Sequence, residues 1–260
     1  MIRLLFLSLI PIIISCKKET TNHFDLAITN AQVIHLETGK VEHQNIFISN
    51  GIIEAVEAVG SINFKADSTI DASGKYLLPG FWDNHIHLRG GDSLIANNKN
   101  FLKLFIANGI TTVRDAGGDL THSVMEWKNK IASEELTGPT IFTAGPKIDG
   151  PKATWAGSLE VETEEAVVQA LDSLEALNVD FVKIYDSRIS PKNYLKAIEE
   201  AKKRGFTVSG HMPFTVTLDE TINAGMDGIE HLYYIMKGSA GNELEVTKKM
   251  NNGEIPRTFE

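Results

Sequence analysis

Cysteine, positive charge and long apolar runs are all scarce in this sequence. The single cysteine, Cys16, can form neither an internal disulfide nor a cysteine-based zinc site, so any metal must use histidine, carboxylate or modified-lysine ligands. A net charge of -9 argues against nucleic acid as the main partner, because phosphate binding needs clustered Lys and Arg. The chain has 260 residues, of which 42% are hydrophobic, and this indicates a globular protein of one large or two small domains.

The longest apolar stretch lies at the N-terminus and is typical of a secretory signal. Arg3 precedes an apolar run at 4–14, which is too short to span a bilayer as a helix but suits the core of a signal peptide. The run ends in Ile-Ile-Ser-Cys, which resembles the lipobox of bacterial lipoproteins, where the cysteine (here Cys16) becomes the lipidated first residue. We therefore expect a signal peptide at 1–15, a lipidated tether at 16–23, and a lipid-anchored location in the bacterial cell envelope, at the outer membrane. Plain secretion with an incidental cysteine is the alternative.

Residues 24–75 have the pattern of a small all-β module. Short alternating segments are separated by turn residues, and Asn50-Gly51 between two apolar runs is a strong hairpin signal. The expected strands are Phe24–Thr29, Ala31–Leu36, Asn45–Ser49, Ile52–Val56 and Ser68–Asp71.

From residue 76 onward the pattern changes to strand and helix in alternation, six times. The expected strands are Leu77–His87, Ile110–Asp115, Pro139–Ala144, Phe181–Tyr185, Phe206–His211 and Gly228–Tyr233. The expected helices lie near Ser93–Asn108, Thr121–Glu135, Thr163–Leu177, Pro191–Arg204, Leu218–Ala224 and Glu243–Met250, and a loop is expected at Gly145–Ser158. This alternation predicts the α/β class with a parallel sheet. Six units complete a doubly wound sheet and fall two short of a β/α barrel.

Side chains that can bind metal recur at the ends of these predicted strands. His85 and His87 share one face of the first strand, Lys183 lies in the fourth, and His211 and His231 end the fifth and sixth. In a β/α barrel all these strand ends open onto one face, where active sites lie. Any one of them alone could be an edge-strand lysine or a histidine that caps a carbonyl, but the set on successive units favours a metal centre.

Lys183 is the most informative member of the set. A protonated amine buried beside two cations would be very costly, so this lysine must be neutral or become an anion. Carbamylation by CO2 would convert it into a carboxylate that bridges two metals, and such a pair can share a hydroxide and polarise a carbonyl.

Together these motifs resemble the amidohydrolase superfamily, and within it the branch of imidazolonepropionases and metal-dependent prolidases. The matching segments, in order, are 78–87, 109–118, 182–185, 210–211 and 228–231. The resemblance implies a TIM-type β/α barrel, of which six of eight units are present, with a small N-terminal β-sandwich part. The corresponding domains are a sandwich part at 24–75 and an incomplete barrel at 76–260.

The resemblance also implies a ligand set and a reaction. His85 and His87 would bind the more buried of two divalent metal ions, expected to be zinc. Lys183, as its carbamate, would bridge both ions, and His211 and His231 would bind the more exposed one. A bridging hydroxide would attack the carbonyl of an amide or peptide bond in a small molecule or short peptide, as in a dipeptidase or prolidase.

Three further residues are candidates for substrate binding. Tyr185 should share the face of the lysine two positions earlier, and Trp155 lies in the loop after the third strand. Arg114 ends the second strand, where a structural ion pair is the alternative to a substrate contact.

The sequence departs from the family pattern at the catalytic aspartate. The family uses an aspartate after its eighth strand, and no Asp follows Asp227 here. We therefore expect a fragment of a longer gene product, with weak or no hydrolase activity of its own. The alternatives are a cyclic-amide hydrolase similar to dihydropyrimidinases and an inactive envelope lipoprotein that keeps the fold for binding. A mononuclear deaminase is less favoured, because it would not need Lys183.

Overall fold

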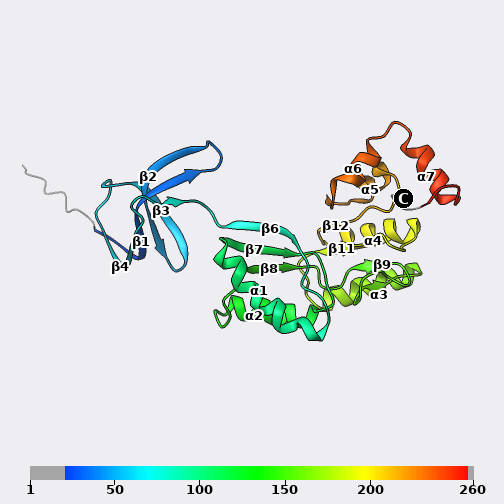
Figure 1. Ribbon diagram of the computed structural model, residues 1–260, viewed down its shortest axis with the longest axis horizontal. Coiled ribbons are helices and arrows are strands. Elements are labelled where there is room, and N and C mark those ends of the chain that lie inside the picture. Colours follow the sequence, from blue (N-terminus) through cyan, green and yellow to red (C-terminus); the bar gives the residue numbers. More distant parts are fainter. Residues whose placement is uncertain (1–20, 257–260) are drawn as a thin grey trace, which may run out of the picture. The chain divides into compact units, whose positions relative to one another are not determined.

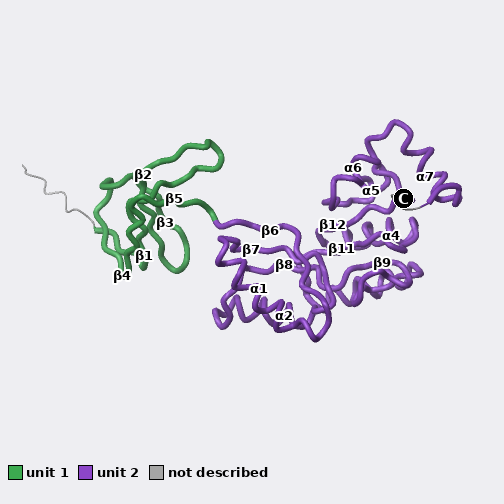
Figure 2. Tube along the Cα trace, in the orientation of Figure 1, with its two compact units in different colours: residues 1–79 green, residues 80–260 purple. Residues whose placement is uncertain are grey.

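The computed structural model describes residues 21–256 and divides into two compact units (Figures 1 and 2). The first unit ends at Pro79 and the second begins at Gly80. The predicted signal peptide and the predicted lipidation site, Cys16, lie outside the described residues. Within the described range, none of the helices combines the length and the apolar character needed to cross a membrane.

The first unit is a single five-stranded sheet. Its strands are β1 (Asn22–His35), β2 (Lys40–Ser49), β3 (Ile52–Ala58), β4 (Phe64–Asp71) and β5 (Tyr76–Leu77). The order is β3-β2-β1-β4, with β5 also paired to β1; the β1–β2 and β2–β3 pairs are antiparallel, and β4 and β5 run parallel to β1. The expected all-β module is therefore present, but as one sheet; residues 21–79 supply no second sheet that would make it a sandwich.

Two predicted strands are one continuous strand in the structure. The prediction ended a strand at Asn30, but β1 passes through this position with a φ of 60° and a register shift between Ile28 and Ala31. The bulge absorbs the extra residue, and the Asn30 side chain donates a 3.0 Å hydrogen bond to Asp71, so the strand bends and continues. β1 also begins at Asn22, within the segment predicted as a tether.

The Asn50-Gly51 hairpin is confirmed. β2 ends at Ser49 and β3 begins at Ile52, and the two residues between them have φ values of 52° and 73°. Two consecutive positive φ values are the geometry of the tight turn that suits twisted antiparallel strands.

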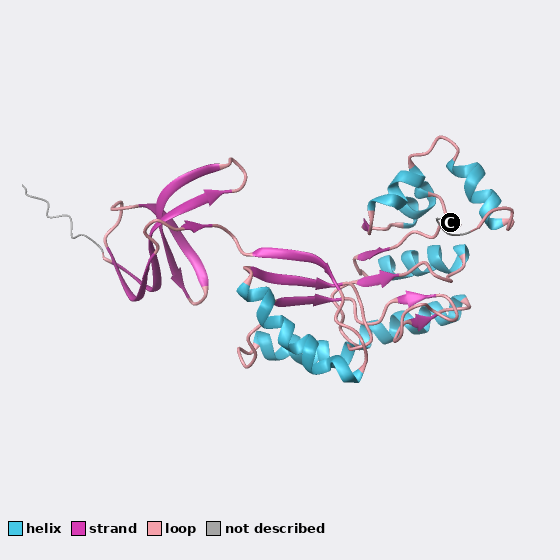
Figure 3. Ribbon diagram, in the orientation of Figure 1, coloured by secondary structure: helices cyan, strands magenta, loops and turns pink. Residues whose placement is uncertain are grey.

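The second unit alternates strands and helices, as expected (Figure 3). Its strands are β6 (Phe81–Ile86), β7 (Ile110–Asp115), β8 (Thr140–Thr143), β9 (Ile148–Asp149), β10 (Leu159–Glu160), β11 (Val182–Ile184), β12 (Val208–Gly210) and β13 (Gly228–Ile229). Its helices are the 3-10 helix η1 (Asp92–Leu94), then α1 (Ile95–Ala107), α2 (Thr121–Ala132), α3 (Glu164–Ala176), α4 (Pro191–Lys203), α5 (Leu218–Ala224), α6 (Leu232–Gly238) and α7 (Glu243–Asn251).

The strands of this unit form two parallel sheets rather than a closed barrel. The orders are β6-β7-β8 and β10-β9-β11-β12-β13. The sheets meet where the Asp180 N–H donates a 2.9 Å hydrogen bond to the Thr143 carbonyl. Within residues 80–256, β6 and β13 each pair with one neighbour only, so the barrel stays open. Closure needs the full strand number at a fixed stagger, which six barrel strands do not supply.

Two local predictions were wrong. The loop expected at Gly145–Ser158 contains β9, because the apolar Ile148 pairs with Ile184 of β11 and adds a strand to the sheet. The last predicted strand, Gly228–Tyr233, is strand only at 228–229. The chain then turns at His231 and enters α6, which follows directly.

The largest core cluster packs α3 and α4 against β11 and β12, which fixes the strands that carry two of the candidate ligands. Gly210 permits this packing, since a Cβ there would lie 2.1 Å from the Ile184 carbonyl oxygen. The close approach of β12 to β11 brings Lys183 beside Ser209 in register and places His211 at the same sheet edge.

Candidate metal centre

The five predicted metal ligands converge at the carboxyl ends of the parallel strands. They are His85 from β6 and His87 just after it, Lys183 from β11, His211 directly after β12, and His231 two residues after β13. The ring centroids of His85 and His87 are 5.1 Å apart, those of His85 and His231 are also 5.1 Å apart, and those of His211 and His231 are 4.9 Å apart. Residues separated by up to 146 positions therefore form one cluster of imidazoles.

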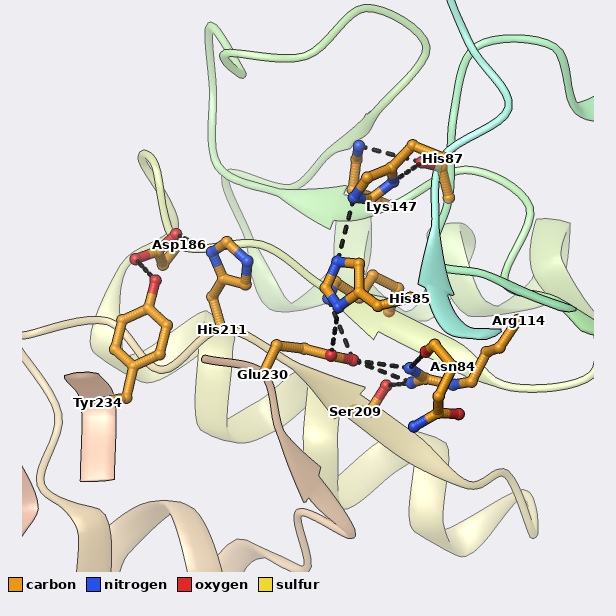
Figure 4. Close-up of polar contacts among 12 residues, drawn as sticks. Asn84, His85, His87, Arg114, Lys147, Asp186, Ser209, His211, Glu230 and Tyr234 are labelled. Atoms are coloured by element: carbon orange, nitrogen blue, oxygen red, sulfur yellow. Dashed lines mark hydrogen bonds and ion pairs between the residues drawn. The ribbon is translucent and has the colours of Figure 1, made fainter. Parts of the chain in front are cut away.

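Hydrogen bonds fix the rings of His85 and His87 (Figure 4). The His85 Nδ1 donates to Glu230 over 2.7 Å, and the His87 Nδ1 donates to the Gly117 carbonyl over 2.8 Å. In neutral rings both Nε2 atoms are then unprotonated, and they face each other at 3.2 Å. Burial lowers the pKa of His87 to about 4, so this ring is neutral at pH 7. A cation bound by both lone pairs would remove their mutual repulsion.

The ring of His211 is held in the same manner from the opposite side of the cluster. Its Nδ1 donates to Asp186 over 2.8 Å, and the other Asp186 oxygen accepts a 2.5 Å hydrogen bond from the Tyr234 hydroxyl. Burial, followed by the charge of Asp186, raises the pKa of Tyr234 far above its usual range, so the hydroxyl keeps its proton. An imidazole that donates one ring nitrogen to a carboxylate and presents the other is the usual arrangement of a metal-binding histidine.

Glu230 carries the negative charge at the base of the cluster. Its carboxylate accepts hydrogen bonds from His85 and, at 3.0 Å, from both terminal nitrogens of Arg114, and it lies 3.3 Å from the Lys183 Nζ. Arg114 also donates to the Ser209 hydroxyl. Burial opposes the ionisation of Glu230, but the His85 hydrogen bond and the charges of Lys183 and Arg114 outweigh it and hold the pKa well below its usual range.

Lys183 is completely buried, and its Nζ makes no hydrogen bond although it lies within ion-pair distance of Glu230. Burial lowers the pKa of this amine to about 8, which favours the neutral form that can react with CO2. A buried amine without a hydrogen bond calls for an explanation, and conversion to a metal-bridging carbamate would supply one.

The donor set fits a metal pair only if Lys183 contributes. Across residues 21–256, no three His, Cys, Asp or Glu side chains are placed to hold one ion by themselves. The predicted set supplies two histidines to each ion and the modified lysine to both, so it needs no third residue of those types. The Nδ1 atoms anchored on His85, His87 and His211 and the buried amine are features that such a pair requires.

A cleft of about 870 Å³ opens beside His211. Tyr185 lines it and lies against the His211 ring, with centroids 4.3 Å apart. The ring centroids of Trp155 and Tyr185 are 6.4 Å apart, in an edge-to-face arrangement, and Trp155 does not line this cleft. Arg114 is not among the residues that line the cleft, and it pairs with Glu230; its predicted contact with substrate stays a prediction.

Sequence reasoning missed Glu230 and Asp186, the two carboxylates that orient the rings. Strand alternation placed Glu230 on the face opposite to His231, but β13 is only two residues long. His231 has a φ of 67°, a conformation uncommon for a residue with a side chain, and this lets both side chains reach the cluster. A carboxylate next to a candidate ligand was the available signal.

Asp115 is a second buried carboxylate near the centre. It is 2% exposed and accepts hydrogen bonds from the Leu88 N–H (3.1 Å) and the Thr143 hydroxyl (2.7 Å). It thereby ties the segment after His87 to β7 and β8. Burial outweighs these bonds and raises its pKa to about 6.

Comparison with known proteins agrees with this geometry. The model of the Amidohydrolase family matches residues 76–252. The chain therefore belongs to the amidohydrolase family. It is 25% identical over 243 residues to an adenine deaminase of Serratia proteamaculans, covering 86% of this chain and 38% of that relative. It is 33% identical over 204 residues to an adenine deaminase of Nitratidesulfovibrio vulgaris, covering 73% and 32%.

Solved structures of the amidohydrolase family share the fold. A putative prolidase from Bifidobacterium longum superposes with a TM-score of 0.69 at 23% identity, covering 79% of this chain and 54% of the prolidase. The chain thus spans little more than half of that structure, and about a third of the length of the curated amidohydrolase relatives.

The Glu230→Gln variant should lose much of its stability. It leaves Arg114 and Lys183 buried without their counter-charge, so we expect the free energy of unfolding to fall by about 3–5 kcal/mol in urea denaturation. Glu199→Gln, at an exposed position on α4, is the matched control and should change it by less than about 0.5 kcal/mol. Adding Lys183→Met to Glu230→Gln should recover part of the lost stability. Equal losses of stability in Glu230→Gln and in the control Glu199→Gln would contradict this account.

Asp115 should make stability depend on pH. Its pKa of about 6 in the folded chain exceeds the usual 3.8, so its contribution is fully present below pH 3.8 and is lost as pH rises through 6. The change is up to about 3 kcal/mol. Urea denaturation of the wild type and Asp115→Asn at pH 4 and pH 8 should show the variant gaining relative stability at pH 8. A difference that stays constant with pH would contradict the prediction.

Proposed function

We propose that this protein is a metal-dependent hydrolase that cleaves an amide or peptide bond in a small molecule or short peptide. The observation that carries the proposal is the imidazole cluster around buried Lys183, in which the Nε2 atoms of His85 and His87 face each other at 3.2 Å. Hydrogen bonds to carboxylates or a carbonyl orient three of its four rings. A packed core gains nothing from such an arrangement, whereas metal binding requires it.

The proposed ligands divide into two pairs. His85 and His87 would hold one ion, His211 and His231 the other, and the Lys183 carbamate would join them. The metals, expected to be zinc, would acidify a water and polarise the scissile carbonyl. The chain's own part is to orient the rings through Glu230, Gly117 and Asp186, which the hydrogen bonds described above support.

The cleft beside His211 suits a short peptide. Its volume of about 870 Å³ is within the range of small-molecule sites. Lys152 and Arg188 line it together with Glu162, so charges of both signs face the cleft, as the two termini of a dipeptide require. Aromatic rings of Tyr185 and Tyr233 supply apolar surface between them.

A second candidate is a hydrolytic deaminase, which also breaks a C–N bond. The curated relatives named adenine deaminase favour it. The two candidates differ in what they ask of Lys183, because a mononuclear deaminase needs no bridging group. Metal stoichiometry therefore separates them.

The purified chain should bind about two zinc ions when zinc and bicarbonate are supplied, measured by elemental mass spectrometry after dialysis. His85→Ala and His211→Ala should each reduce the bound zinc, and Lys183→Ala should reduce it most, because this residue serves both ions. Asp186→Asn removes no ligand but frees the His211 ring, and should weaken zinc binding about 10–100-fold.

His122→Ala is the control for these variants, since His122 is exposed on α2 and should leave the zinc content unchanged. One ion per chain, with Lys183→Ala harmless, would favour the deaminase. No retained metal in the wild type would contradict both candidates.

The zinc-loaded chain should hydrolyse dipeptides weakly or not at all. The sequence has no aspartate after Asp227 to take the proton-transfer role that the family assigns to its strand-eight residue. Release of free amino acids from dipeptides, ring opening of dihydrouracil and deamination of adenine should be assayed side by side, and any turnover should favour dipeptides. Turnover of dipeptides near a typical enzyme rate of about 10 s⁻¹ would contradict the need for that aspartate. Turnover of adenine alone would contradict the substrate class.

A further inference from the structure

A second, smaller cavity lies among the loops that follow β6, β7, β8 and β9. It measures about 190 Å³, and we call it the Trp155 cavity after the indole that lines it together with Arg89, Lys147 and Asp119. The Arg89 guanidinium lies 4.0 Å from the Trp155 ring centroid, and the Lys147 Nζ lies 5.3 Å from it. Two cations therefore share one aromatic wall of one cavity.

Among the described residues, neither cation has a counter-ion. Lys147 is 2% exposed, and its Nζ makes one hydrogen bond, 3.2 Å to the Gly117 carbonyl, although an ammonium can donate three. Within residues 21–256, no carboxylate forms an ion pair with Lys147 or with Arg89. Burying an ammonium costs much free energy unless an anion accompanies it, so this pair of cations lacks the group that would offset the cost.

The acids nearest to Lys147 are already occupied by other donors. Asp119 accepts from the N–H groups of Gly90 and Gly91 at 2.8 and 3.0 Å, and Asp115 accepts from Leu88 and Thr143. The third acid, Asp149, is bound by the Gly150 and Arg188 N–H groups and the Ser187 hydroxyl. These carboxylates hold the loops in place and act on the ammonium only from a distance.

We propose that the Trp155 cavity is a binding site for a small oxyanion, a carboxylate or a phosphate group, held by Arg89 and Lys147. The guanidinium presents paired donors that match the geometry of such a group, and the ammonium has two donors left. The indole keeps water from the cations on one side, which strengthens their attraction for an anion.

The site lies next to the imidazole cluster but does not depend on metal. Lys147 and His87 donate to the same carbonyl, that of Gly117, so an anion on Lys147 lies just behind the His87 ring. The anion has two sources: a carboxylate belonging to a bound substrate, or a free ion such as inorganic phosphate. Both use the same donors, and binding measurements separate them.

Isothermal titration calorimetry on the metal-free chain at constant ionic strength tests the proposal. The ligands are inorganic phosphate, acetate, N-acetylglycine and N-acetylglycinamide. We expect saturable binding of the anions and none of the neutral amide. If the site serves a substrate carboxylate, N-acetylglycine binds more tightly than acetate; if it serves a free ion, phosphate binds best and the two carboxylates bind alike. Either result supports the oxyanion site.

Two variants and one matched control decide the assignment. Arg89→Gln and Lys147→Met should each weaken anion binding about tenfold or more, because each removes a charged donor. Lys248→Met removes an exposed cation on α7, away from both cavities, and should leave binding unchanged. Arg89 is only half-buried, so its variant keeps the test valid if the buried Lys147 variant fails to fold, which circular dichroism will reveal.

The proposal is overturned if no anion binds saturably, or if Arg89→Gln binds anions as the wild type does. It is also overturned if Lys248→Met weakens binding as much as the two cavity variants, since the anions would then be held by general surface charge.

Discussion

The carboxylate of Glu230 is the contact on which the arrangement of this centre depends. It joins β6, β7, β11 and β13 through His85, Arg114, Lys183 and its own backbone, so four strands meet on one pair of oxygen atoms. Its negative charge also allows a guanidinium and an amine to lie under the histidines. Without it, the ring of His85 would lose the bond that directs its Nε2 toward His87.

The fold brings this chemistry together because parallel strands end at a common edge. The strands of the second unit are short, and several polar residues of the centre lie just past their carboxyl ends, at His87, Asp186, His211 and Glu230. The core cluster of α3 and α4 on β11 and β12 makes that edge rigid. The ligands thus need only local backbone turns to meet, and the positive φ of His231 is one such turn.

Much of this could be predicted from the sequence, because apolar runs, glycines after helices and histidines at strand ends are local signals. Each of the six predicted barrel-type strands has a counterpart, but the first begins at Phe81 and not at Leu77, which pairs with β1 in the first unit, and the last is shorter than expected. The ring-orienting bonds were not predictable, since the bond from His85 to Glu230 spans 145 positions. The Ile148–Ile184 pairing likewise turned an expected loop into a strand. Such features depend on tertiary contacts, for which residue type and spacing give no warning.

Positive charge is in excess around His87, both beside the imidazole cluster and in the Trp155 cavity. Arg114 and Lys183 share the carboxylate of Glu230, whereas Arg89 and Lys147 form no ion pair with a carboxylate of the described residues. A neutral His87 between these groups is stable, whereas a protonated one would add a further cation, and burial together with the nearby lysines lowers its pKa accordingly. The same excess that keeps the imidazole available to a metal therefore also favours an anion nearby. An oxyanion in the Trp155 cavity would offset the charge without competing for the lone pair of His87, because it would lie on the Nδ1 side of the ring.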